Sequence, residues 1–496
     1  MAAGKLKAMQ ETKPPARPPR ARLVVPSRSD LLLKNFTEVI GGPMGSRSAP
    51  GLVSPGVFTV ERVLIILTVL AALAGLAVKG YCRANGWQAP GQFYSTCYSD
   101  FPDFFRNRGL GTDPFAFLTA GNLFDYPVLV GFVAGAAAWL VPGEGVTDAR
   151  ILGFFDVNAT LIAAVWIVTV LATARMSQRR PWDAAMVALA PGIVLAGTIN
   201  WDLWAVGLLA LGMLCFARER LVLAGVLFGL AAATKPYAAL ILAAILVLSV
   251  RTGRIRPFLV AGGAAAAAWL AVNIPVAVAN PTGWGYFFGS TESREAGYGS
   301  VWFAYNLVAR RLRWGVLDPA VINVLALALF LLACAAVAFV ALTAARRPRL
   351  AQIAFLIVAA FILTNKVYSP QVVLWLIPLV ALARPRWRDF LVWQGVEGLY
   401  WAAIWMYLGQ VTSQGPTQHN IDMPYYVLAV AAHMLVTAYL MGRVVWDIYD
   451  PNYDPIRRHH LDDPQGGPFN GVPDWLRFAP LSRSQAVLPW RAKHHA

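Results

Sequence analysis

Residues 57–78 read VFTVERVLIILTVLAALAGLAV, and residues 97–106 read CYSDFPDFFR. The first stretch is long enough to cross a bilayer, which takes about 20 consecutive apolar residues. The second stretch places two carboxylates, Asp100 and Asp103, and the cation Arg106 shortly beyond that span. Together they indicate a membrane protein with a charged loop at one membrane face.

The composition of the whole chain agrees with this interpretation. Of the 496 residues, 57% are hydrophobic and only 14% are charged, whereas about a quarter of the residues are charged in ordinary soluble proteins. The formal net charge of +16 comes from Lys and Arg clusters between apolar runs and in the N-terminal region. This distribution is typical of cytoplasmic loops and excludes a nucleic-acid-binding patch.

The other apolar runs set the number of spans, and they lie near residues 126–142, 151–174, 182–199, 203–217, 220–233, 236–250, 257–279, 320–344, 350–364, 371–383, 389–409 and 423–442. Short cytoplasmic loops carry excess Lys and Arg, which places inside the clusters Arg175/Arg179/Arg180, Arg218/Arg220, Arg251/Arg254/Arg256, Arg346/Arg347/Arg349, Arg384/Arg386/Arg388 and Arg443. The alternate loops face the other side: residues 200–202, 234–236, 280–318, 364–371 and 410–422.

The segment 126–142 breaks this alternation, because a full crossing there would put the basic loop at Arg175 outside. The segment is short, begins with Tyr126-Pro127 and contains glycine. We expect residues 126–141 to be re-entrant or partly inserted on the external side, where protein or water can satisfy the backbone. The sequence thus predicts an all-α polytopic membrane protein with about 12 transmembrane helices and both termini inside.

Three regions follow from composition. Residues 1–55 are rich in Pro, Arg, Ser and Gly, which predicts a disordered basic cytoplasmic tail. Residues 56–445 form the transmembrane domain, with external loops at about 80–150 and 280–318. Residues 446–496 return to Pro, Asp, Gly and Arg, which predicts a cytoplasmic C-terminal tail of little regular structure.

Polar residues beside the spans fall on the predicted external side. Asp100 or Asp103 can serve as a base that takes a proton from an acceptor hydroxyl, although both can also be solvated loop charges or helix caps. Asp125 and Asp202 lie at span boundaries, where acids indicate a functional site or cap a helix. Lys235 suggests an anionic ligand such as a lipid phosphate, or it snorkels to the interface.

Two more external loops carry candidate ligand-binding residues. Loop 280–318 combines charged and aromatic side chains, including Arg294, Glu295 and Trp302, a mixture suited to glycan recognition with Arg294 holding a phosphate or carboxylate. An interfacial aromatic belt has similar composition. Lys366, between two spans, can bind a donor phosphate, although a helix break before Pro370 also explains the segment's composition.

Cysteine and histidine usage gives two further expectations. Of the four cysteines, Cys82 and Cys97 flank the same external loop, and they can be bridged if that side is oxidising, although spacing alone does not establish a bond. The six histidines form no ligand set. We therefore expect no metal site and no other cofactor.

The chain resembles the GT-C class of polyprenyl-phosphate-sugar-dependent glycosyltransferases, and specifically glycosyltransferase family 87 of the bacterial cell envelope. The resemblance covers roughly residues 57–440. It rests on the order and sidedness of five motifs: Tyr98-Ser99-Asp100, Asp125-Tyr126-Pro127-Val128-Leu129, Asn200-Trp201-Asp202-Leu203, Thr234-Lys235-Pro236-Tyr237 and Asn365-Lys366-Val367-Tyr368-Ser369-Pro370-Gln371.

The resemblance implies a GT-C-type helical bundle and an inverting, metal-independent transfer of one sugar, usually mannose, from polyprenyl phosphate to a lipid or glycan acceptor. The reaction takes place on the outer face of the bacterial plasma membrane. The catalytic Asp maps onto Asp100, with Asp103 as the alternative. The residues expected to contact the donor phosphate are Lys235, Arg294 and Lys366. The residues expected to bind substrate are Tyr98, Asp125, Tyr126, Asp202, Glu295, Trp302, Tyr368 and Gln371.

Other functions remain compatible with the sequence. Arabinofuranose is the alternative sugar. A transporter or flippase of a lipid-linked glycan would also place charged residues on broken helices, but it should show repeat symmetry and polar residues near span centres, and neither is clear here. A catalytically silent scaffold for other envelope enzymes is the third alternative.

Overall fold

The computed structural model of the chain describes residues 24, 29–39, 59–413, 420–457 and 462–478. Most of the predicted N-terminal tail and the end of the predicted C-terminal tail therefore lie outside the described residues. Among the described residues, all regular secondary structure is helical. A short helix, α2 (Leu31–Val39), lies within the predicted N-terminal tail.

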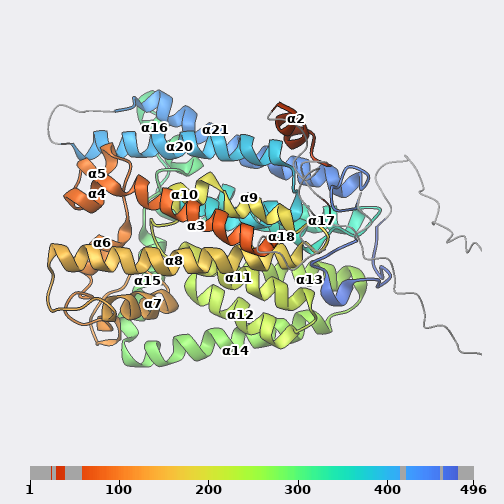
Figure 1. Cartoon of the computed structure of the whole chain (residues 1–496), viewed down its shortest axis with the longest axis horizontal. Helices are drawn as coiled ribbons and strands as arrows, with labels where there is room; N and C mark the ends of the chain where they lie inside the picture. Colours follow the sequence, from red (N-terminus) through yellow and green to blue (C-terminus); the bar gives the residue numbers. More distant parts are fainter. Residues whose placement is uncertain (1–23, 25–28, 40–58, 414–419, 458–461, 479–496) are drawn as a thin grey trace, which may run out of the picture.

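The remaining elements follow in chain order (Figure 1). They are α3 (Val60–Val78), α4 (Gly80–Asn85), α5 (Gly91–Tyr94), α6 (Asp100–Asn107), η1 (Ala116–Leu118), α7 (Val128–Trp139), α8 (Asp148–Met176), η2 (Pro181–Ala184), α9 (Ala185–Ala188), α10 (Pro191–Ala196), α11 (Asp202–Ala217), α12 (Leu221–Thr234), η3 (Pro236–Ala239), α13 (Leu240–Thr252), α14 (Arg256–Ala279), α15 (Pro281–Ser293), α16 (Val301–Leu312), α17 (Pro319–Thr343), α18 (Leu350–Thr364), η4 (Pro370–Val372), α19 (Val373–Ala383), α20 (Trp387–Thr412), α21 (Met423–Tyr449) and η6 (Gly467–Phe469).

Five of the described helices, α3, α8, α14, α17 and α21, are long and apolar enough to cross a membrane. The other predicted spans coincide with α20 and with shorter apolar segments of 10–17 residues. The predicted all-α membrane fold is therefore confirmed. The number of about 12 crossings stays a prediction, because the shorter segments fall below the length that a span requires.

Helix α7 occupies the segment that was predicted not to cross. Its 12 residues are too few for the hydrocarbon core. The preceding loop packs closely on it, since a Cβ at Gly135 would lie 2.5 Å from the carbonyl oxygen of Pro114. The long helix α8 then runs almost the full length of the bundle (Figure 1), so the chain reaches the opposite end only after α7.

The connecting loops gather at two opposite ends of the bundle. Helices α4–α7, α15 and α16 lie at one end, on the left of Figure 1, which we call the loop end. There the side chain of Asn280 donates to the carbonyl oxygens of Phe117 and Asn122, at 3.0 and 2.8 Å. The two long loops predicted to be external are thus tied together.

The opposite end, which we call the arginine end, holds the basic loops. Residues 450–457 and 462–478 lie across it and contain little regular structure except η6. Gln465 donates to the carbonyl oxygen of Met176 at the end of α8, and the ring of Phe469 packs on Phe216 at the end of α11. The C-terminal segment therefore covers helix ends that are far apart in the sequence.

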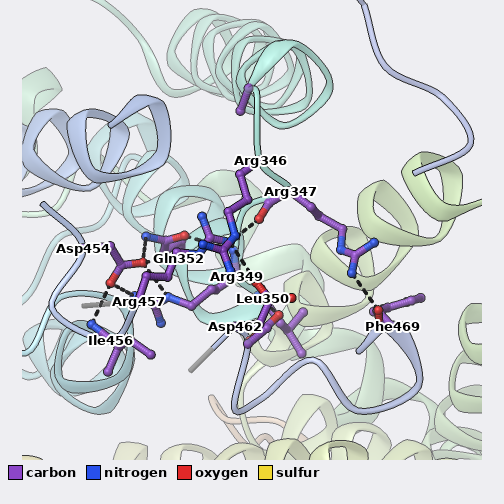
Figure 2. A network of polar contacts seen from close by, with 12 residues as sticks. Arg346, Arg347, Arg349, Leu350, Gln352, Asp454, Ile456, Arg457, Asp462 and Phe469 are labelled. Carbon is purple, nitrogen blue, oxygen red and sulfur yellow. Dashed lines mark hydrogen bonds and ion pairs between the residues drawn. The ribbon is translucent and has the colours of Figure 1, made fainter. Parts of the chain in front are cut away.

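Buried arginines anchor this segment (Figure 2). Arg349 is fully buried and donates to both carboxylate oxygens of Asp454, at 2.8 and 3.0 Å, and to the carbonyl oxygens of Leu382 and Ala383. Breaking a buried ion pair by removing one partner leaves an uncompensated charge. The predicted positive-inside clusters thus have a packing role at this end as well.

Candidate active site

The first turn of α6 fixes Asp100 at the loop end. The hydroxyl of Ser99 donates to the carbonyl oxygen of Thr198 at 2.8 Å and also accepts from the backbone N–H of Phe101 as the helix cap. The backbone N–H of Asp100 donates to the carbonyl oxygen of Ile199 at 2.8 Å. These bonds hold the start of α6 against the turn that precedes α11.

The carboxylate of Asp100 is partly buried and is held by two tyrosines. The hydroxyl of Tyr98 donates to one oxygen at 2.6 Å, and that of Tyr126 to the other at 2.5 Å. Asp103 is exposed and accepts from the side chain of Asn107 at 2.6 Å. The two carboxylates of the opening motif therefore have different environments, and only Asp100 joins the other predicted residues.

An ion pair between half-buried Lys235 and buried Asp202 lies beside Asp100. The ammonium of Lys235 is 2.7 Å from one oxygen of Asp202 and 4.6 Å from the centre of the Tyr126 ring. The indole N–H of Trp375 donates to the other oxygen of Asp202 at 3.0 Å. We call the group formed by these residues the Asp100 cluster; its members are Tyr98, Asp100, Tyr126, Asn200, Asp202, Lys235 and Trp375.

The cluster brings together five of the residues predicted as functional, from four separate motifs. Asn200 and Trp375 were not assigned roles from the sequence. Asn200 donates to the hydroxyl of Tyr126 at 3.2 Å and accepts from the backbone N–H of Asp202 at 3.0 Å. Asn200 thus connects the hydroxyl that holds Asp100 with the segment that bears Asp202.

Lys79 is a further residue that the sequence did not single out. It follows α3, is fully buried, and donates to the carbonyl oxygen of Tyr98 at 2.7 Å. Burial lowers the pKa of Lys79 to about 7, and the charge of Asp100 opposes that shift. Burial also raises the pKa of Asp100, against the hydrogen bonds of the two tyrosines and the charge of Lys235. A carboxyl with a raised pKa is suited to accept a proton near neutral pH.

Lys366 and Arg294 form a second group of predicted residues. The ammonium of buried Lys366 donates to the carbonyl oxygen of Glu292 at 2.8 Å. Burial, followed by the neighbouring charge of Arg294, lowers the pKa of Lys366. Within the described part of the chain, no ion pair joins Lys366 or Arg294 to a carboxylate, and no hydrogen bond joins them to the Asp100 cluster.

The remaining predicted residues lie nearby in different roles. Asp125 forms an ion pair with Arg108. Trp302 is buried and its indole N–H donates to the carbonyl oxygen of Thr364 at 2.9 Å, so it joins two loops that were predicted to be external. Tyr368 is also buried, and its hydroxyl donates to Glu397 at 3.0 Å. Gln371 is half-buried and Glu295 is exposed.

An apolar cavity of about 440 Å³ adjoins the Asp100 cluster and shares Tyr126 with it. Its walls come from the loop before α7 and from α12, α13, α14 and α15, and they include Phe124, Phe228, Trp269 and Trp284. Asn273 is a rare polar side chain in this lining, and it accepts a hydrogen bond from Trp284 at 3.0 Å. The cavity therefore suits a hydrocarbon chain rather than a polar ligand.

Two further predictions concern covalent and metal links. The structure joins Cys82 and Cys97 by a disulfide, with Cα atoms 5.8 Å apart. The bond ties α4 to the residue before Tyr98. Among the described residues, no group of three or more His, Cys, Asp or Glu side chains is placed to hold a metal ion.

Comparisons with known proteins bear on the identity of this site. Residues 124–370 match the family model of glycosyltransferase family 87. Among solved structures, the chain is similar to the crystal structure of ArnT from Cupriavidus metallidurans bound to undecaprenyl phosphate, with 14% identity, a TM-score of 0.39, and coverage of 76% of this chain and 77% of that chain. A comparison with curated proteins found no match.

The matched region contains four of the five motifs on which the resemblance rests. The last of these motifs ends one residue beyond the matched region, at Gln371. The Tyr98-Ser99-Asp100 motif precedes it but joins the same cluster in space. The expected family is thus confirmed, and with its apolar helices the chain belongs to glycosyltransferase family 87 and is a multi-pass membrane glycosyltransferase.

Proposed function

We propose that this protein transfers one sugar, mannose, from polyprenyl phosphate to a hydroxyl of a lipid or glycan acceptor of the cell envelope. The observation that carries the proposal is the position of Asp100. Its carboxylate is partly exposed, is oriented by two tyrosines, and lies beside an apolar cavity with which the cluster shares Tyr126. A base next to a lipid-binding cavity is what transfer from a lipid-linked donor requires.

The apolar cavity supports a lipid-linked donor. Helix α14, which forms one of its walls, is mostly unburied within the protein, so it can face lipid. A polyprenyl chain can enter from the bilayer with its hydrocarbon in contact with residues such as Trp269 and Phe287. Its phosphate would then lie at the loop end, close to Tyr126.

The proposed reaction is a direct displacement. Asp100 takes the proton of the acceptor hydroxyl, and the hydroxyl oxygen forms a bond to the anomeric carbon of the sugar. The bond between that carbon and the phosphate oxygen breaks, and polyprenyl phosphate leaves with the electron pair. Attack from the side opposite to the leaving group inverts the anomeric configuration, and no metal ion takes part.

Cations at the loop end would stabilise the departing phosphate. In the described part of the chain, Lys366 and Arg294 form no ion pair within 4.0 Å, and the charge of Glu292 acts on Lys366 from farther away. Both cations therefore have donors free for a phosphate. Lys235 shares its charge with Asp202. We therefore assign to Lys235 the role of lowering the pKa of Asp100. It would share contact with the phosphate with Lys366 and Arg294.

We place the loop end on the external side of the bacterial plasma membrane. A disulfide between Cys82 and Cys97 supports an oxidising compartment there. The arginine-rich loops at the opposite end support a cytoplasmic location for that end. The acceptor would accordingly be a component assembled outside the cytoplasm.

The proposal can be tested with the full chain purified into lipid nanodiscs. Undecaprenyl-phosphate mannose serves as the donor probe and octyl mannoside as the acceptor probe, with mass spectrometry of the product. Wild-type protein should form octyl dimannoside and release undecaprenyl phosphate in equal amounts. Movement of the donor across proteoliposome membranes without any new glycosidic bond would instead establish a flippase and overturn the proposal.

A further inference from the structure

A second cavity, of about 290 Å³, lies between α16 and the start of α17 at the loop end. Its walls combine four polar side chains with apolar ones, namely Glu295, Asn306, Arg310 and Asp318 with Ala296, Phe303, Leu307, Val316, Leu317, Pro319 and Ile322. The first cavity has an almost wholly apolar lining. The first cavity therefore suits the hydrocarbon of a lipid-linked molecule, and the second suits a molecule that bears hydroxyl groups.

Two of the four polar side chains in the second cavity stabilise its wall. Asn306 accepts from the backbone N–H of Leu317 at 2.9 Å and donates to its carbonyl oxygen at 3.0 Å. Asp318 caps α17 by accepting from the backbone N–H of Val321 at 2.9 Å. These bonds fix the turn between α16 and α17, so the cavity wall is built before a ligand arrives.

The other two polar side chains have no hydrogen-bond or ion-pair partner among the described residues. Glu295 and Arg310 are exposed side chains on the cavity wall. Among the described residues, neither forms a hydrogen bond or an ion pair, with the other or with any third group. A carboxylate and a guanidinium on one cavity wall, both unpaired, offer strong acceptors and strong donors to a ligand.

The cavity is adjacent to the Lys366 group. The side chain of Asn323, next to Ile322 in the cavity wall, donates to the carbonyl oxygen of Glu292 at 3.0 Å. The ammonium of Lys366 donates to the same carbonyl oxygen at 2.8 Å. Helix α17, which begins at the cavity, is the least buried of the membrane-spanning candidates, so a molecule held in the lipid can reach the cavity from the membrane surface.

We propose that this cavity binds the carbohydrate portion of the acceptor, an inference that rests on the proposed glycosyl transfer. Sugar hydroxyls donate to the carboxylate of Glu295 and accept from the guanidinium of Arg310, and the ring of Phe303 lies against the C–H face of the sugar. Lys366, which is joined to the edge of this cavity through the carbonyl oxygen of Glu292, is the cation assigned to the donor phosphate. The acceptor would be a membrane-anchored molecule with at least one sugar residue.

The test compares Glu295→Gln and Arg310→Gln with Arg311→Gln, an exposed neighbour on α16 that does not line the cavity. With octyl mannoside as the acceptor probe, each cavity variant should raise the KM for acceptor by about tenfold, the loss expected for a hydrogen bond to a charged group. The kcat, the KM for undecaprenyl-phosphate mannose and the donor hydrolysis rate without acceptor should stay at wild-type values. Arg311→Gln should leave all four unchanged.

The outcomes separate the two proposals. Wild-type transfer with an unchanged acceptor KM in both cavity variants overturns the acceptor subsite and leaves the transfer function intact. If wild-type protein transfers nothing, the transfer function fails, and saturation-transfer NMR with octyl mannoside decides the subsite. A signal that the Glu295→Gln/Arg310→Gln double variant loses supports the subsite, and absence of a wild-type signal overturns it.

Discussion

The two ends of the bundle treat buried cations differently. Among the described residues, five of the six buried arginines lie at the arginine end, each within 4.0 Å of a carboxylate: Arg180, Arg251, Arg349, Arg384 and Arg457. At the loop end, buried Arg150, Lys79 and Lys366 instead donate to backbone carbonyl oxygens. The buried arginines of one end are paired with carboxylates, whereas at the other end Asp100 and Glu292 act on Lys79 and Lys366 only from beyond ion-pair distance.

This difference separates structural charges from functional ones. A buried ion pair that satisfies both partners contributes to packing and leaves nothing for a ligand. A buried cation on a carbonyl oxygen has hydrogen-bond donors in place but no carboxylate within ion-pair distance, so an anion or a developing negative charge can take that position. The comparison predicts that substitutions at the loop end change catalysis, whereas those at the arginine end change stability.

The largest effect should come from Asp100→Asn, which keeps the shape of the side chain but removes the base. We expect the transfer rate to fall by about 10²–10⁴-fold, with unchanged thermal unfolding in nanodiscs. The matched control is Asp103→Asn on the same helix, whose exposed carboxylate should be dispensable. Loss of activity in the control with retention in Asp100→Asn would reverse the assignment of the base.

At the arginine end, Arg349→Met should act through folding. It leaves Asp454 buried without its partner, which costs about 3–5 kcal/mol of unfolding free energy. The double variant Arg349→Met/Asp454→Leu should recover much of this loss because no lone charge remains. Thermal unfolding measures the stability, and transfer per folded molecule should match wild type. A catalytic defect without a stability defect would break the comparison.

Lys366→Met tests whether a cation without an ion-pair partner binds the phosphate of the donor. We expect the KM for undecaprenyl-phosphate mannose to rise by about 10–100-fold, the range for a lost charged hydrogen bond, with the KM for acceptor unchanged. Lys366→Arg keeps the charge and should restore most of the donor affinity. Equal losses in the methionine and arginine variants would indicate that the bond to the carbonyl oxygen of Glu292 matters only for loop structure.

The smallest effect concerns pH. Burial raises the pKa of Asp100, and the positive charge of Lys235 opposes that rise. Since the base must be deprotonated, activity is lost as pH falls through the pKa of Asp100. In Lys235→Met that pKa is higher, so the acidic limb of the kcat/KM profile should move to higher pH. Lys235→Arg should leave the limb in place, and an unmoved limb in Lys235→Met would argue against electrostatic tuning.

Much of the Asp100 cluster was predictable from the sequence. Asp100, Asp202 and Lys235 are polar residues at the ends of apolar runs, and the loop count placed all three at one end of the molecule. That count needs only charge and span length, which the sequence contains. The choice between Asp100 and Asp103 was not predictable, because it depends on the contact between Ser99 and Thr198, 99 positions apart.

Other features left no distinctive trace in the sequence. A lysine directly after an apolar run, such as Lys79, usually snorkels to the interface, and only packing shows that this one is buried. Trp375 is one of 18 tryptophans, so its bond to Asp202 could not be foreseen. The polar composition of residues 450–478 predicted little regular structure, but composition does not reveal that Arg349 finds Asp454 across 105 positions.

The C-terminal cover of the arginine end also has a consequence for biosynthesis. Asp454, Asp463 and Asp474 are translated after every helix of the bundle, so Arg349 and Arg251 leave the ribosome before their carboxylates exist. Membrane insertion can proceed without them, but Arg349 and Arg251 lack these carboxylate partners until the C-terminal segment docks. A nonsense mutation before codon 454 should therefore yield a product that cellular proteases remove, which immunoblotting of tagged truncations would measure.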